Sequence, residues 1–167
     1  MSTKSDTKSG AAGREIVATR IFDAPRELVW EAWTDPSKVT RWWGPNGFTT
    51  TTVEIDVRPG GIWKYIMHGP DGTDYPNLTR YVEPVKPERI VYINSGGKDD
   101  IPHGEFRATI TFEDEGGRTR LTVRMEFASV SERDRVAREY GAVEGLEQHL
   151  ARLTQFLASN PINSQKG

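Results

Sequence analysis

The chain of 167 residues contains no cysteine, which excludes disulfide bonds and thiolate chemistry. It also lacks an apolar run long enough to cross a membrane, and its small, polar first residues do not resemble a secretion signal. Neither sign of charge dominates, since 22 basic residues stand against 24 acidic ones. A basic surface is what attracts nucleic acid and anionic membranes. We therefore expect neither partner, and we predict a cytoplasmic protein.

Residue types that carry chemistry are also scarce. The three histidines, His68, His103 and His149, are scattered, without the spacing that places metal ligands on one face. No glycine-rich loop is followed by the lysine and hydroxyl residue of a phosphate-binding site, and no serine sits in a G-x-S-x-G turn. We therefore predict no metal site and no cofactor, and we assign no residue to catalysis.

Aromatic residues are concentrated instead. Four of the five tryptophans, Trp30, Trp33, Trp42 and Trp43, lie within fourteen residues. Two Pro-containing start signals, around Pro25 and Asp35-Pro36, predict two short helices here. Because adjacent helical residues point about 100° apart, the indoles cannot all face one way. We predict that Trp33 and Trp42 face a ligand, while Trp30 and Trp43 fix the helices to the rest of the protein.

The order of predicted elements indicates an α+β fold. A strand over Arg14–Phe22 precedes the two short helices, and β-type patterns then run from Thr49 to Phe127. Alternation in EFRATITFEDEGGRTRLTVRMEF places Phe106, Ile110 and Met125 on one dry face. A long helix is predicted from Ser131 to Leu157. We expect one domain over residues 14–158, flanked by disordered segments at 1–13 and 159–167.

Several motifs together resemble one family. They are FDAPRELVWEAWTDP (Phe22–Pro36), WWGP (Trp42–Pro45), DVRPGGIW (Asp56–Trp63), PERIV (Pro87–Val91) and EGL (Glu144–Leu146). In order and spacing they are similar to the activator of heat-shock-protein-90 ATPase homologue family, in the START-like (SRPBCC), birch-pollen-allergen-like superfamily. The resemblance implies a helix-grip fold. In this fold a curved antiparallel sheet of about six or seven strands wraps around a long C-terminal helix and leaves a cavity between sheet and helix.

The resemblance also suggests what the protein binds and how Leu146 affects the cavity. The superfamily binds hydrophobic or amphipathic small molecules, some branches carry out chemistry in the cavity, and the family takes its name from co-chaperones. Family members commonly have tryptophan where this chain has Leu146, so the cavity should be wider beside Gly145. Glycine also weakens a helix, which suggests that Gly145 allows the close approach of another group or a kink.

A candidate site follows from the dry sheet face and the apolar stripe of the last helix. The predicted cavity wall consists of Trp33, Trp42, Trp63, Tyr65, Met67, Phe106, Ile110, Met125, Leu146 and Leu150. Taken singly, each would also suit an ordinary core between sheet and helix. Asn94, Tyr92 and His149 are candidates for orienting a ligand, because an apolar pocket needs few polar groups. Alternation leaves open whether Tyr92 or Ile93 faces inward.

Three functions are compatible with this pattern. The first is non-enzymatic binding of a hydrophobic or aromatic small molecule, lipid-like or polyketide-like, in the cavity. The second is a cyclase- or hydrolase-like activity on an aromatic substrate, with Tyr65, Asn94 or His149 as participants. The third is a stress-related protein that modulates a chaperone. A homodimer, through an edge strand or the tryptophan-rich helices, is left open.

Overall fold

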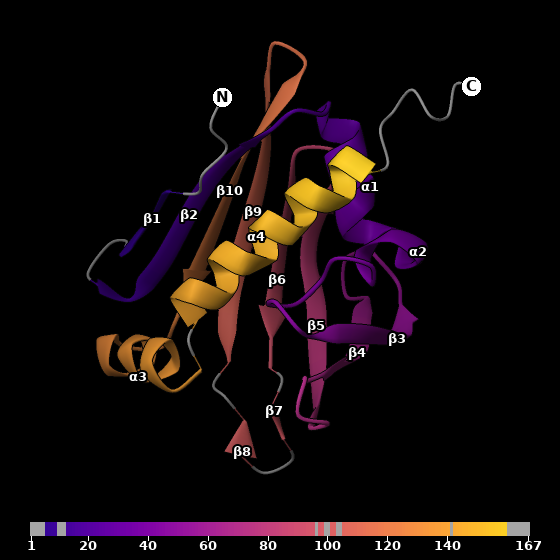
Figure 1. Cartoon of the computed structure of the whole chain (residues 1–167). Coiled ribbons are helices and arrows are strands. Elements are labelled where there is room, and N and C mark those ends of the chain that lie inside the picture. The colour runs from indigo at the N-terminus through magenta and orange to yellow at the C-terminus, as the bar shows by residue number, and fades with distance from the viewer. Residues whose placement is uncertain are drawn as a thin grey trace.

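Strands and helices form two layers in the computed structural model, a curved sheet and the helices on its inner side (Figure 1). The structure describes residues 6–9, 13–95, 97–98, 101–102, 105–140 and 142–159. His103, Gly141 and residues 160–167 of the predicted tail lie outside the described residues.

The sheet is antiparallel throughout and follows the order β1-β2-β10-β9-β6-β5-β4-β3. Its strands are β1 (Asp6–Ser9), β2 (Glu15–Phe22), β3 (Thr49–Ile55), β4 (Ile62–His68), β5 (Asp74–Val85), β6 (Arg89–Asn94), β9 (Phe106–Glu115) and β10 (Arg118–Glu126). A separate pair joins β7 (Gly97–Lys98) to β8 (Ile101–Pro102).

The eighth strand of the sheet departs from the sequence prediction. Strand β1 lies within the segment 1–13, for which we expected disorder, and residues 6–9 pair with residues 16–19 of β2. Backbone hydrogen bonds along a sheet edge need no apolar side chains, so a polar segment can pair there without a hydrophobic signal in its sequence.

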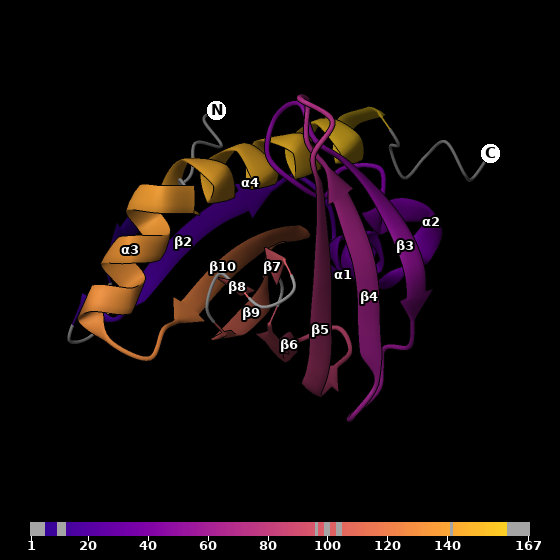
Figure 2. The same cartoon turned by 90° about the horizontal axis from the view of Figure 1, so that it is seen from below.

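Four helices accompany the sheet: α1 (Arg26–Thr34), α2 (Pro36–Val39), α3 (Val130–Tyr140) and α4 (Ala142–Ser159). Helix α4 crosses the inner side of the sheet, which curls around it (Figure 2). This confirms the predicted helix-grip arrangement. The single C-terminal helix that we predicted is instead two helices, α3 and α4. The residue between them in the sequence is Gly141, and glycine favours the helix less than any residue except proline.

The strand register aligns inner-face residues into rows across the sheet. One row runs from β5 to β2 through Tyr81, Tyr92, Ala108, Met125 and Ile16, since each pairs with the next. All but Met125 are buried. Because paired residues point to the same face, this row settles the inward residue of β6 as Tyr92.

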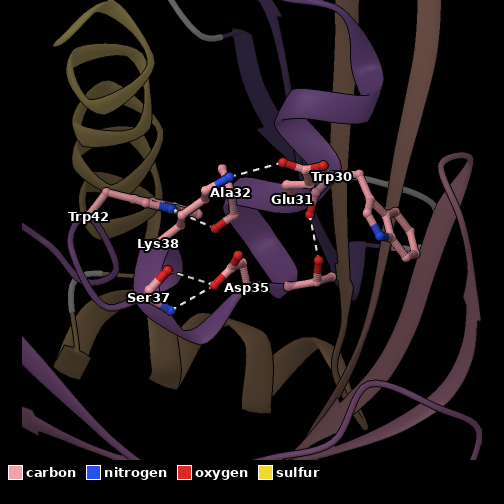
Figure 3. A network of polar contacts seen from close by, with 8 residues as sticks. Trp30, Glu31, Ala32, Asp35, Ser37, Lys38 and Trp42 are labelled. Carbon is pink, nitrogen blue, oxygen red and sulfur yellow. Dashed lines mark hydrogen bonds and ion pairs between the residues drawn. The ribbon is translucent and has the colours of Figure 1, made fainter. Parts of the chain in front are cut away.

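The α1–α2 corner is fixed by a network of polar contacts (Figure 3). The Asp35 carboxylate accepts hydrogen bonds from the backbone N–H and the hydroxyl of Ser37, which caps α2. The Lys38 ammonium pairs with Glu31 at 2.9 Å, and the Trp42 indole N–H donates to the Ala32 carbonyl at 2.9 Å. These contacts hold Trp42 against α1.

The loop after Trp42 is tied to α4. The two hydrogens of the Arg152 Nη1 atom are shared among four backbone carbonyl oxygens that lie 2.9–3.4 Å from it, those of Trp43, Gly44, Pro45 and Phe48. The Asn46 N–H also donates to the Gln148 side chain at 3.0 Å. Helix α4 thereby holds the tryptophan-bearing loop in place.

Candidate functional site

An aromatic cluster joins the tryptophan-rich segment to strand β4. The Trp43 ring lies 4.7 Å from the Trp63 ring and 6.0 Å from the Tyr65 ring, between centroids. Trp63 stacks on Tyr65 at 4.0 Å, and Trp33 contacts Trp42 and Trp43 edge-on at 5.2 and 5.4 Å. All five side chains are buried. The sequence-predicted wall residues Trp33, Trp42, Trp63 and Tyr65 are thus brought together in one packed group.

The two members of the second tryptophan pair have different partners. Trp43, rather than Trp42, reaches the β4 aromatics, whereas Trp42 is bound to the α1 backbone through its N–H. The first pair follows the prediction more closely, since Trp30 packs edge-on against Phe112 of β9 at 5.5 Å. Which indole contacts a ligand stays a prediction.

His149 projects from α4 into this cluster. Its ring lies 4.2 Å from the Trp43 ring and 4.9 Å from the Trp42 ring, between centroids. Burial, together with the nearby Arg152 charge, lowers the pKa of His149 from 6.5 to about 3. The imidazole is therefore neutral at pH 7. Its buried Nε2 atom and the buried Trp33 Nε1 atom have no hydrogen-bond partner in the part of the chain that the structure describes.

A polar group lies beside the cluster on β4, β5 and β6. The Asn94 amide donates to the Tyr65 hydroxyl at 3.4 Å and to the Thr79 hydroxyl at 3.2 Å. Burial raises the pKa of Tyr65 to about 12, although hydrogen bonds from Trp43, Asn94 and Thr79 oppose the shift. The Tyr65 hydroxyl is therefore protonated at neutral pH. From the sequence we predicted Tyr65 and Asn94 but not Thr79, which pairs with Asn94 across the strands and so shares its face.

The remaining predicted wall residues divide into two kinds. Ile110 and Leu150 are fully buried in the large core. Met67, Phe106, Met125 and Leu146 are only half-buried. Three of these four, Phe106, Met125 and Leu146, pack against both the large core and a second, smaller cluster formed by Ile16, Phe127 and Val136. The half-buried residues therefore mark the junction of two cores.

Helix α4 has a glycine, Gly145, next to Leu146. A Cβ atom built on Gly145 would have no side-chain or other non-local atom within 4 Å, and its neighbour Leu146 is half-buried. The predicted free space beside Gly145 is consistent with this geometry.

Gly145→Ala is expected to stabilise the protein by about 0.5–1 kcal/mol, because alanine favours a helix interior by that amount and nothing obstructs its methyl group. Urea unfolding at pH 7 measures the change. Gly61→Ala is the matched control: its Cβ would lie 2.0 Å from the Asp56 carbonyl oxygen, so this variant should be destabilised. Loss of stability in Gly145→Ala would show that the space is filled.

A separate recess lies outside this region, between α1, α2 and the end of α4. Its volume is about 210 Å³, and its lining contains none of the predicted wall residues; it is formed by Leu28, Ser37, Lys38, Arg41, Phe156 and Leu157. Pockets for small organic ligands usually measure roughly 300–1,000 Å³. This recess is smaller than that range, and the predicted wall residues lie elsewhere, in the core beneath α4 and at its edge.

From the sequence we predicted no metal site. Within the described ranges, no three His, Asp or Glu side chains gather as metal ligands would. Among the same residues, no helix is both long and apolar enough to span a membrane.

Comparisons with known proteins agree with the fold. The family described as "Activator of Hsp90 ATPase homolog 1-like protein" matches residues 23–158. A crystal structure of a Mycobacterium smegmatis protein is 27% identical, with a TM-score of 0.83, and the match covers 93% of this chain and 98% of that one. A solution structure of an Arthrobacter aurescens protein is also 27% identical, with a TM-score of 0.85 and coverage of 94% and 92%.

A third structure, of a protein from Silicibacter pomeroyi named for the same family, is 21% identical and has a TM-score of 0.72. The match covers 88% of this chain and 99% of that one, and at this identity it supports the fold alone. No curated protein matches the chain.

Proposed function

Since the chain belongs to the family of Activator of Hsp90 ATPase homolog 1-like proteins, we propose that it binds an apolar or aromatic small molecule between the inner face of its sheet and helix α4. The observation that carries this proposal is the junction of the two cores, where Phe106, Met125 and Leu146 remain half-buried beside the open flank of Gly145. Large apolar side chains that are only partly buried at the edge of a core are suited to contact a ligand.

The chemistry of the neighbouring polar groups favours binding over turnover. A general acid or base works best when its pKa is near the operating pH. The pKa of His149 is lowered to about 3 and that of Tyr65 is raised to about 12, in both cases chiefly by burial. Both groups therefore keep one protonation state around neutral pH. They suit hydrogen bonding better than proton transfer.

Leu146→Trp is expected to weaken binding of the neutral fluorescent probe N-phenyl-1-naphthylamine at least tenfold, because the larger side chain fills the proposed site. Probe fluorescence titrated with the full chain measures the affinity. Leu157→Trp is the matched control: it makes the same change at the other end of α4, beside the external recess, and should leave affinity unchanged. Absence of probe binding to the unmodified protein, or equal effects of the two variants, would contradict the proposal.

The family membership also supports a second candidate, activation of an Hsp90-type ATPase. Protein-docking surfaces usually gather exposed apolar residues. Among the described residues, the large apolar side chains that are exposed are Val53, Val82 and Val130, from three different elements. This dispersion gives the chaperone role less support than ligand binding. A rise in the ATPase rate of purified Hsp90 on addition of the protein would establish it.

A further inference from the structure

Two tyrosines lie side by side on the inner face of the sheet, and their hydroxyls have no hydrogen-bond partner among the described residues. Tyr81 of β5 pairs with Tyr92 of β6 in the register, and their ring centroids are 6.4 Å apart. Both side chains are buried, with 3% and 8% of their surface exposed. Neither hydroxyl forms a hydrogen bond with any residue in the described ranges, in contrast to Tyr65, whose hydroxyl has several partners.

Such an arrangement is unusual inside a protein. Neither hydroxyl is among the fully buried polar atoms that lack a partner, so each keeps some accessible surface although its side chain is largely buried. Phenylalanine would fill the same space without placing a polar group there. Two adjacent hydroxyls that are accessible and have no partner in the described ranges can therefore bond a polar atom from outside the chain.

The neighbours of the tyrosine pair in the sheet include a residue of the proposed ligand site. The next residue in the row after Tyr92 is Ala108, the smallest side chain of that row, and the one after it is half-buried Met125. The tyrosine pair therefore lies in the same inner-face row as Met125, one of the residues at the junction of the two cores.

The charge around the pair decides what kind of polar atom fits. Burial raises the pKa of both tyrosines well above the usual value, and each is raised further by Tyr65, so all three hydroxyls are neutral donors at pH 7. Arg20, which shares the inner face, lies on β2, three strands from β6, and Glu147 offsets its charge. A ligand carboxylate beside Tyr92 would therefore be desolvated without a cation to pair with it.

We propose that Tyr81 and Tyr92 form a subsite for an uncharged oxygen, a hydroxyl or carbonyl, on an otherwise apolar ligand. The inference rests on the proposed function, because it assigns the polar end of the same ligand. It narrows the ligand class to neutral aromatic alcohols, phenols and ketones and disfavours fatty acids and other anions.

The test compares naphthalene, 2-naphthol and 2-naphthoate, which share one ring system and differ in a single substituent. Binding is measured by ligand-observed NMR on the full chain. We expect 2-naphthol to bind about tenfold more tightly than naphthalene, and 2-naphthoate to bind more weakly than 2-naphthol. In Tyr92→Phe, or Tyr81→Phe, the preference for 2-naphthol should fall to less than about threefold while naphthalene affinity is retained.

Tyr75→Phe is the control variant, since it removes a hydroxyl from β5 six residues, or about 20 Å, from Tyr81. It should keep the full preference for 2-naphthol. Equal binding of naphthalene and 2-naphthol to the unmodified protein would overturn this inference and leave the proposed function standing. A preference that survives in both Phe variants would also overturn it. No binding of any of the three compounds would overturn the proposed function as well.

Discussion

Lowering the pH from 7 to 4.5 is expected to remove about 2–3 kcal/mol of stability through His149 alone. The pKa of this histidine is lowered from 6.5 to about 3 in the folded protein, first by burial and then by the charge of Arg152. In the unfolded chain the imidazole is protonated below pH 6.5, whereas in the folded protein it stays neutral down to about pH 3. The unfolded state therefore gains a proton that the folded state cannot accept.

The direction of the effect follows from this difference. Stability from His149 is fully present above pH 6.5 and is lost as the pH falls toward 3, by about 1.4 kcal/mol per pH unit. Carboxylates whose pKa values are lowered, such as Asp35 and Glu83, also destabilise the fold in acid. A comparison with His149→Phe separates the two contributions, because the carboxylates are common to both proteins.

Urea unfolding at pH 7, 5.5 and 4.5 measures the effect. His149→Phe keeps an aromatic ring among the tryptophans but has no proton to gain, so it should lose about 2–3 kcal/mol less than the unmodified protein over this range. His68→Gln, which alters a histidine at the end of β4, leaves His149 in place and should retain the full loss. An identical loss of stability in His149→Phe and the unmodified protein would show that His149 is accessible to protons in the folded state.

Much of the fold was accessible from sequence because side-chain periodicity reports directly on which face is buried. The alternation in β9 and β10 placed Phe106, Ile110 and Met125 on the inner face, and the structure confirms this register. In β6 alternation could not identify the inward residue, because the neighbours Val91 and Tyr92 are both buried. Only the pairing of Tyr92 with Ala108 across the sheet identifies the inward residue.

Other features were hidden because no side-chain pattern encodes them. Strand β1 pairs through its backbone, which needs no apolar pattern. The different partners of Trp42 and Trp43 could not be read either, because α2 ends at Val39 and both indoles lie in the turn that follows it. Tyr81 was overlooked because the other inward residues of β5, Asn77 and Thr79, are polar, so no apolar alternation marks the buried face of this strand.

Trp43→Ala is expected to destabilise the protein by about 3–5 kcal/mol, in the upper range for a buried aromatic truncated to alanine. The Trp43 ring contacts Trp33, Trp63, Tyr65 and His149 at once, and its side chain hydrogen-bonds the buried Tyr65 hydroxyl. The truncation would leave a cavity at the point where the loop, β4 and α4 meet. We expect the melting temperature to fall by roughly 10 °C.

Trp43→Phe separates the two roles of this side chain, since it keeps most of the apolar contact but removes the indole N–H. It should cost about 1–2 kcal/mol, chiefly through the lost partner of Tyr65. Thermal unfolding followed by near-ultraviolet circular dichroism measures both variants. A loss below about 1 kcal/mol in Trp43→Ala would mean that the indole is dispensable for the core. Trp43 would then be a candidate for the ligand-facing role that we first assigned to Trp42.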